Sequence, residues 1–190
     1  MEKLSGSKQS LLEAFAYFLT FKTVEEIKVS ELIRQAEVSR STFYRLFETK
    51  EEFFQWVLDY HMKGLSGVAK YTANSPLEFY HHYFTYIYDH AIYFKTFNNS
   101  SMWPQFHYKM NQIGIDVYRN FIYSKTSDQT LSQVLSNYVV NAHIGVVMAW
   151  LNEKPLQTPD KLAELVTAMT TSVFASQQLS LEEVFPYEQS

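Results

Sequence analysis

The sequence predicts an all-α protein of about nine helices, with an N-terminal three-helix unit followed by a larger helical bundle. Apolar residues recur at spacings of three and four along most of the chain, a pattern that gives an α-helix one apolar face. Several of these stretches begin with helix-capping residues or with proline at the first helical position. Hydrophobic residues make up 46% of the 190 residues, which is ample for a buried core.

The first two helices are predicted by their apolar stripes. The first is expected from about Ser7 to Thr20, and the second from about Val29 to Ala36. The first stripe consists of Leu11, Leu12, Phe15, Phe18 and Leu19, and the second of Val29, Leu32, Ile33 and Ala36. These faces can pack against each other and against a third helix.

A short third helix is expected after Ser39, which is a good N-cap. Val38 before it and Phe43 four positions into the helix fit a hydrophobic staple. The helix has an aromatic face formed by Phe43, Leu46 and Phe47, and a polar face formed by Arg40, Ser41, Tyr44 and Arg45. Because a helix of two turns does not hold its shape alone in water, we expect the aromatic face to be buried and the polar face to point outward.

That polar face suits DNA recognition. The N-terminus of a helix offers free N–H groups and a positive dipole to phosphate, while arginine and short polar side chains reach base edges in the major groove. The alternative interpretation is a capped surface helix with an ordinary solvated face.

Residues 27–53 resemble the helix-turn-helix of TetR-family transcriptional regulators. The resemblance rests on the pattern Val-Ser-x-x-Thr-Phe-Tyr-x-x-Phe-x-x-Lys at residues 38–50, which is specific to that family. The chain departs from the family at Lys28, where a threonine cap is frequent, and at Glu37, where a turn glycine is usual. We expect Glu37 to adopt a left-handed backbone at a cost of about 1 kcal/mol.

The resemblance implies a helix-turn-helix DNA-binding domain, placed at residues 1–50, and a helical regulatory and dimerisation domain at residues 51–190. The residues expected to bind DNA are Lys28, Ser39, Arg40, Ser41, Thr42, Tyr44, Arg45 and Lys50. The first-turn position of Arg40 favours contact with a base edge. Tyr44 and Lys50 are carried over from the family as phosphate contacts, with Thr42 supporting them.

The charge of the chain favours a small DNA footprint. The net charge is −4; residues 1–50 carry eight Lys/Arg against seven Asp/Glu, and residues 51–190 carry eight against thirteen. A DNA-binding protein is usually strongly basic, and this chain is not. We therefore expect its affinity for DNA to depend on dimerisation. Without cysteine, disulfides and thiolate metal sites are excluded. No apolar run approaches the length of a membrane span, and Met1–Ser10 lacks a signal-peptide core, so we expect a cytoplasmic protein.

A fourth helix is expected to begin after Thr49, which forms a capping box with Glu52. It should run past Met62, with Gly64 and Gly67 weakening its end. The resemblance makes this helix the link between the DNA-binding domain and the remainder of the protein.

An aromatic-rich region follows a linker at residues 71–76. Ser75 as N-cap and Pro76 at the first helical position begin the next helix. Residues 79–123 are dense in tyrosine and phenylalanine, and a polar break at residues 98–101 separates a short helix from a longer one. Most of these rings are expected in the core.

A small-molecule effector pocket is the further expectation for this region, since tyrosine hydroxyls around an apolar space are typical of ligand sites. Most of the weight of this expectation comes from the family resemblance. The residues expected to line the pocket are Tyr83, Phe84, Tyr86, Tyr88, Phe106, His107 and Tyr118.

Two long helices are expected at about 130–151 and 158–175, the second beginning with Thr158 and Pro159. Their surplus of apolar surface predicts a homodimer in which these helices form a four-helix bundle, with Gly145 allowing close approach. The region that contains Tyr138, Gly145, Trp150, Leu151, Thr158 and Pro159 resembles the C-terminal region of the DhaS-like branch of the TetR family.

No enzymatic or metal-dependent activity is indicated. The sequence has no Gly-x-Ser-x-Gly elbow, no Gly-rich phosphate loop and no His-Glu-x-x-His spacing, and adjacent His81 and His82 point to different helix faces. We therefore expect no cofactor and no metal. The predicted function is a DNA-binding, effector-responsive dimeric regulator; the alternative is a helical adaptor that acts mainly through a protein or metabolite partner, with weak DNA contact.

Overall fold

The computed structural model describes residues 4, 6–71, 73–153 and 157–185, and within them it contains nine α-helices, one 3-10 helix and no strand. The elements are α1 Gly6–Leu19, α2 Val29–Gln35, α3 Arg40–Leu46, α4 Lys50–Tyr71, α5 Pro76–Asp89, α6 Ala91–Asn98, α7 Trp103–Thr126, α8 Gln129–Trp150, α9 Pro159–Ala175 and the 3-10 helix η1 Leu181–Val184. The all-α prediction is confirmed. Residues 1–3 and 5 of the expected polar N-terminus, and Thr72 of the expected linker, lie outside the described residues.

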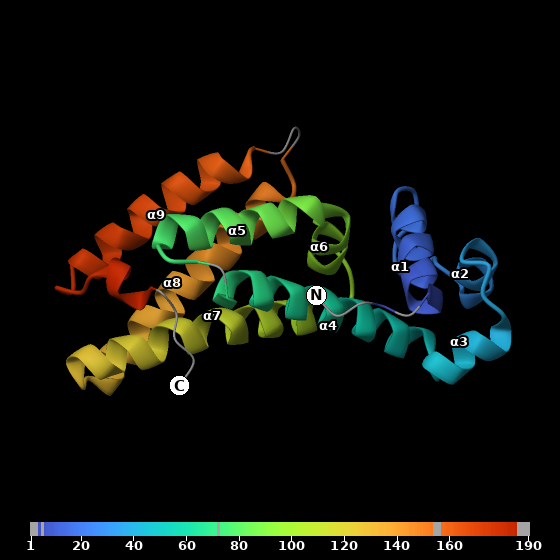
Figure 1. Ribbon diagram of the computed structural model, residues 1–190, viewed down its shortest axis with the longest axis horizontal. Coiled ribbons are helices and arrows are strands. Elements are labelled where there is room, and N and C mark those ends of the chain that lie inside the picture. The colour runs from blue at the N-terminus through green and yellow to red at the C-terminus, as the bar shows by residue number, and fades with distance from the viewer. Residues whose placement is uncertain (1–3, 5, 72, 154–156, 186–190) are drawn as a thin grey trace.

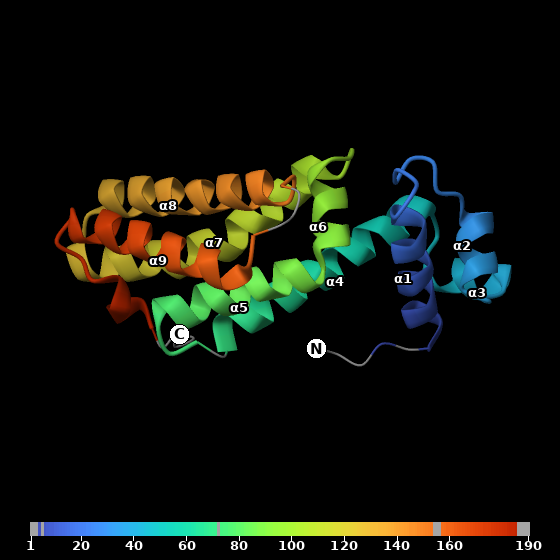
Figure 2. The same cartoon turned by 90° about the horizontal axis from the view of Figure 1, so that it is seen from above.

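The molecule is elongated, and α4 runs from the end that holds α1, α2 and α3 into the larger bundle (Figures 1 and 2). Helices α1, α2 and α3 form one end, and α5, α7, α8 and α9 form the other, with α6 between them (Figures 1 and 2). None of the helices in the described ranges is long and apolar enough to cross a membrane.

The two ends share one continuous core through α4 and α6. Phe15 of α1 packs against Phe53 and Phe54 of α4, with ring centroids 5.6 and 5.1 Å apart. Tyr93 of α6 donates its hydroxyl proton to the carbonyl of Leu12, at 3.0 Å. The N-terminal three-helix unit is therefore fixed to the bundle by both aromatic packing and a buried hydrogen bond.

Helix α4 passes through both of its glycines and ends at Tyr71, so the expectation that Gly64 and Gly67 would weaken its end is wrong. The reason lies in the packing of α5 on α4. A Cβ at Gly64 would fall 2.0 Å from the hydroxyl oxygen of Tyr86, so glycine is what lets the Tyr86 ring lie against α4. Tertiary packing thus outweighs the low helix propensity of glycine.

A break at His90 divides the first part of the aromatic region into α5 and α6, which the sequence pattern did not predict. His90 caps both helices, and its backbone N–H donates to the carbonyl of Tyr86 at 3.2 Å. Its ring nitrogen Nδ1 lies 2.8 Å from the same carbonyl. This local bonding offers the backbone an alternative to continuing the helix.

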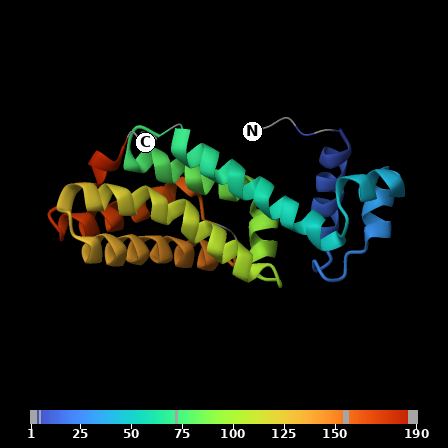
Figure 3. The ribbon, with the colours of Figure 1, turned by 90° about the horizontal axis from the view of Figure 1, so that it is seen from below.

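The bundle is built from two closely packed helix pairs, α7 with α8 and α5 with α9 (Figures 2 and 3). A Cβ at Gly114 of α7 would fall 2.8 Å from Val140 of α8, which shows how closely these two helices approach. The predicted N-caps are present at Ser75 and Thr158, whose hydroxyls accept from the amides of Glu78 and Lys161.

Candidate functional site

The N-terminus of α3 is organised by the side chain of Ser39. Its hydroxyl oxygen accepts from the backbone N–H of Thr42 at 3.1 Å, as an N-cap does. The same oxygen lies 3.0 Å from the hydroxyl of Ser41 and 2.8 Å from that of Thr42. Three hydroxyl groups therefore surround the start of α3, and the predicted cap is confirmed.

The two faces of α3 differ as the sequence predicts. Phe43 is fully buried and packs against Phe47 and Phe53, with ring centroids 5.7 and 6.0 Å apart. On the opposite side the exposed residues are Arg40, Ser41, Tyr44 and Arg45. The guanidinium of Arg40 lies 5.4 Å from the centre of the Tyr44 ring, within the range of a cation–π interaction.

Lys50, at the start of α4, is half-buried and bonded to the loop before α2. Its ammonium nitrogen lies 3.4 Å from the carbonyl of Glu25 and 3.3 Å from that of Ile27. Lys28 is exposed at the N-terminus of α2, and its backbone N–H donates to the carboxylate of Glu31 at 3.1 Å. A lysine ammonium has no lone pair with which to accept from the first-turn N–H groups, so this helix start has the Glu31 half of a capping box without the N-cap half.

The turn between α2 and α3 contains Glu37 in a left-handed conformation, with φ of 52°. The strained backbone predicted for this position is confirmed. An L-residue with a side chain is less favourable here than glycine, because its Cβ crowds the backbone.

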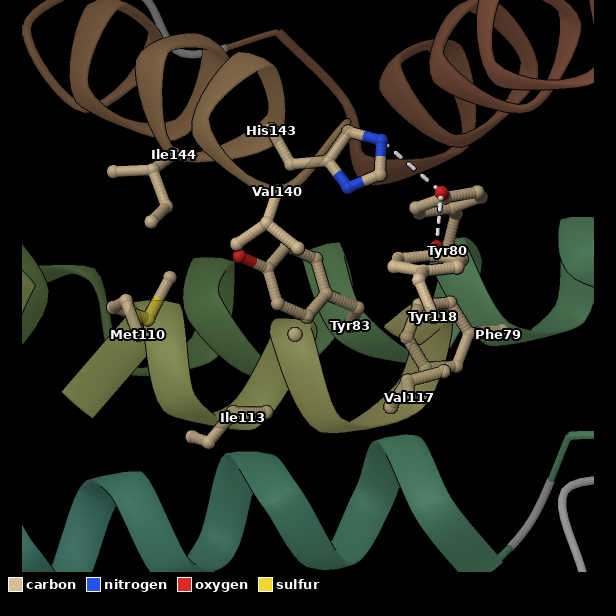
Figure 4. Close-up of a pocket in the computed structure, with 11 residues that line it drawn as sticks. Phe79, Tyr80, Tyr83, Met110, Ile113, Val117, Tyr118, Val140, His143 and Ile144 are labelled. Carbon is tan, nitrogen blue, oxygen red and sulfur yellow. Dashed lines mark hydrogen bonds between the residues drawn. The ribbon is translucent and has the colours of Figure 1, made fainter. Parts of the chain in front are cut away.

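A cavity of about 30 Å³ lies between α5, α7 and α8 (Figure 4). Its walls are aromatic and aliphatic, and none of its lining residues is Lys, Arg, Asp or Glu. The lining residues are Phe79, Tyr80, Tyr83, Met110, Ile113, Gly114, Val117, Tyr118, Val140, His143 and Ile144. The space is small and predominantly apolar.

A buried hydrogen-bond network forms the polar end of this cavity. The hydroxyl of Tyr80 lies 2.7 Å from that of Tyr118 and 3.1 Å from Nε2 of His143, as the dashed lines in Figure 4 mark. Thr170 of α9 joins the network at 3.0 Å from the same nitrogen. Burial lowers the pKa of His143 to about 3, so its ring is neutral at pH 7.

Only two of the seven residues expected to line an effector pocket, Tyr83 and Tyr118, line this cavity. Tyr86 and Tyr88 face other neighbours: Tyr86 stacks on His90 with ring centroids 4.3 Å apart, and Tyr88 is 44% exposed beside Trp150. The other three are Phe84 and Phe106, which are fully buried in the core, and His107, which packs on Trp103. These five residues therefore do not line this cavity, and their expected role in effector binding stays a prediction.

The lining residues that the sequence reasoning missed follow the helical spacing of three helices. Phe79 and Tyr83 are four residues apart on α5, as are Val140 and Ile144 on α8. Such spacing identifies an inward face. It does not distinguish a face that fills the core from one that borders a cavity, because that depends on which helices meet.

His61 of α4 is a second buried polar group, at the junction with α6. It is 1% exposed, and neither ring nitrogen has a hydrogen-bond partner among the described residues. Its ring lies 4.1 Å from that of Tyr93 and 5.1 Å from that of His90. Burial, with a smaller contribution from His90, lowers the pKa of His61 to about 3.

The last two long helices expose apolar side chains. Val134 and Tyr138 of α8 are each 61% exposed, and Leu165 and Met169 of α9 are 46% and 54% exposed. A Cβ added at Gly145 of α8 would meet no atom within 4 Å. The described residues contain no group of three His, Asp or Glu side chains that could hold a metal ion.

Comparisons with known proteins identify the family. Residues 74–172, just over half of the chain, match the family model described as a transcriptional regulator C-terminal region (TetR_C_8). No curated protein sequence matches the chain.

The fold is similar to several solved structures. It aligns with the dihydroxyacetone kinase operon activator DhaS at a TM-score of 0.69 and 12% identity, covering 92% of this chain and 98% of that one. A transcriptional regulator of the TerR/AcrR family from Aquifex aeolicus VF5 aligns at 0.69 and 16% identity, covering 88% and 99%. A TetR transcriptional regulator from Streptococcus agalactiae 2603V aligns at 0.66 and 21% identity, covering 86% and 93%. The chain belongs to the TetR family of transcriptional regulators, which are DNA-binding proteins and not enzymes.

Proposed function

We propose that this protein binds operator DNA as a homodimer, with α3 of each protomer in the major groove, and that a small-molecule effector changes its affinity. The outward face of α3 carries the proposal. Arg40, Ser41, Tyr44 and Arg45 are exposed together on a helix whose opposite face is anchored by Phe43. An anchored helix with exposed arginine and hydroxyl groups can enter the major groove without rearranging.

The proposed contacts divide into base and phosphate contacts. Arg40 in the first turn reaches a base edge, and Tyr44 binds phosphate. The ammonium group of Lys50 has three N–H donors, and two of them can bond to the loop carbonyls. The third N–H binds phosphate. Lys28, Ser41, Thr42 and Arg45 complete the DNA-facing set, and Ser39 contributes through the cap that holds the helix start.

The proposed dimer interface consists of α8 and α9, whose exposed apolar residues would be covered by the same helices of a second copy. In this arrangement Gly145 lies where the two copies approach most closely. Gly145→Leu should therefore convert a dimer into a 22.3 kDa monomer in light scattering. Gly67→Leu is the matched control, since a Cβ at that helical glycine also meets no atom within 4 Å. A wild-type mass of 22.3 kDa at micromolar concentration would contradict the proposed dimer.

The proposed effector site is the cavity between α5, α7 and α8. Helix α5 contributes Tyr80 and Tyr83 to the cavity and, three residues after Tyr83, places Tyr86 against Gly64 of α4. A ligand that favours one position of α5 would bias α4, and with it the spacing of the two DNA-binding units, by population shift. Because operator binding requires access to the chromosome, the proposal also places the protein in the cytoplasm.

The experiment that tests operator binding uses DNA from upstream of the protein's own gene. Fluorescence anisotropy over a salt series should give saturable binding whose logarithmic affinity falls linearly with the logarithm of salt concentration. Unrelated DNA of the same length is the control for sequence preference. Equal affinity for both DNA fragments at every salt concentration would contradict a sequence-specific regulator and favour the adaptor function.

A further inference from the structure

The cavity contains a tyrosine hydroxyl without a partner. Tyr83 is 8% exposed, and its hydroxyl makes no hydrogen bond with any residue that the structure describes. Figure 4 shows this hydroxyl on the side of the cavity where Met110 and Ile144 lie. Those two side chains offer it no strong acceptor or donor. This hydroxyl is therefore free to bond a ligand group that enters the cavity.

The neighbouring polar groups are already used. Tyr118 and Thr170 both lie within hydrogen-bonding distance of Tyr80, at 2.7 and 3.4 Å, and Nε2 of His143 contacts Tyr80 and Thr170. The network has three hydroxyl protons, from Tyr80, Tyr118 and Thr170. If Nε2 of His143 acts as an acceptor, each of these protons has an acceptor within the network. The network therefore needs nothing from Tyr83.

The walls of the cavity disfavour a charged occupant. The lining residues carry no Lys, Arg, Asp or Glu, and burial keeps His143 neutral by lowering its pKa. An ion that entered would lose its hydration without gaining an opposite charge. Aromatic rings at Phe79, Tyr80 and Tyr118, together with Met110, favour a compact apolar body.

The inner volume limits what can bind there. About 30 Å³ accommodates a polar group and a few adjoining atoms, compared with ~150 Å³ for a cavity that holds benzene. Ile113, Gly114 and His143 are half-buried and form a rim, past which the remainder of a ligand would extend outward. The hydrogen-bonding group of the ligand would thus enter first.

We propose that the effector is a small, uncharged molecule, apolar apart from one hydroxyl or carbonyl group, and that Tyr83 recognises that group. This inference rests on the proposed effector function of the same cavity. Tyr83 is then a specificity-determining residue, because the apolar walls accept many shapes while its hydroxyl selects for one hydrogen-bonding group.

The test uses phenol as the probe, with toluene and benzoate as the apolar and charged comparisons. Thermal shift against ligand concentration gives an apparent affinity for wild type, Tyr83→Phe and the control Tyr108→Phe, which removes a hydroxyl that is outside the cavity on a 63% exposed side chain. Phenol should bind wild type and Tyr108→Phe alike, and Tyr83→Phe about tenfold more weakly. Toluene, which has no polar group to enter the inner volume, should bind all three proteins alike and more weakly than phenol binds wild type, and benzoate should bind none.

Equal phenol affinity in wild type and Tyr83→Phe would overturn the role of Tyr83, and benzoate binding as tight as phenol would overturn the uncharged class. Because Tyr83→Phe removes only an unpaired oxygen, it should melt no lower than wild type, which keeps the comparison valid. Operator anisotropy without ligand separates the two proposals. Normal operator binding with no phenol-specific shift overturns this inference alone, whereas absent operator binding overturns the proposed function.

Discussion

The polar face of α3 is assembled within one helix of seven residues, whereas the cavity is assembled from three helices, and its hydrogen-bond network includes Thr170 of a fourth helix, 90 residues from Tyr80. On α3 the cap, the buried ring and the exposed cations are set by spacings of three and four in the sequence. In the cavity, neighbours such as Tyr83 and Val140 meet only because α5, α7 and α8 pack together. Local chemistry therefore determines the first region, and tertiary packing determines the second.

The largest expected effect tests how firmly α3 is anchored. Phe43→Ala should lower the free energy of unfolding by about 3–5 kcal/mol, because it removes a fully buried ring from the contact with Phe47 and Phe53. Chemical denaturation measures the change. Tyr44→Phe, at the exposed neighbouring position, is the control and should leave stability nearly unchanged. A Phe43→Ala protein as stable as wild type would show that α3 is held by something other than its aromatic face.

His61 tests the connection between the two regions, since it lies in α4 beside α6. Its pKa is about 3 in the folded protein against 6.5 in the reference state, so the unfolded chain binds more protons between these values and stability falls as pH decreases. Between pH 6.5 and 5, wild type should lose about 1–2 kcal/mol more than His61→Leu. Denaturation at these two pH values measures the difference. His143 shifts in the same direction in both proteins and cancels. Identical pH dependence would mean that His61 is not buried in neutral form.

Lys50 tests whether one side chain serves both the fold and the DNA. Lys50→Ala should reduce the salt dependence of operator binding by about one unit of slope per protomer, because one phosphate contact and its counterion are lost. The affinity of wild type and variant over a salt series gives the two slopes. Unchanged slope together with a lower melting temperature would assign Lys50 only to the loop carbonyls of Glu25 and Ile27.

The smallest expected effect concerns the turn before α3. Glu37→Gly should raise the free energy of unfolding by about 0.5–1 kcal/mol, since glycine adopts the left-handed conformation at φ of 52° without strain. Glu37→Ala, which keeps a Cβ, is the control and should bring no such gain. A destabilised Glu37→Gly protein would mean that the Glu37 side chain makes a favourable contact in the folded state.

Much of the fold was predictable because capping and periodicity are local. Ser39, Ser75 and Thr158 all cap the helices that the sequence assigned to them. The errors share another cause: Gly64 stays helical because Tyr86 packs over it, and the break at His90 depends on bonding to the Tyr86 carbonyl. Phe84 and Phe106 have the same aromatic character as the cavity residues but fill the core. Their sequence pattern could not separate these two environments.

The DNA-binding function of the α3 face is tested most directly by Arg40→Ala in a well-folded protein. Operator affinity measured against a panel of single base-pair substitutions should show discrimination at one position reduced by about 1–3 kcal/mol, while the melting temperature stays at the wild-type value. Arg119→Ala, which removes an exposed cation from α7, should leave both unchanged. Undiminished discrimination at every position in Arg40→Ala would contradict the assignment of this face to base recognition.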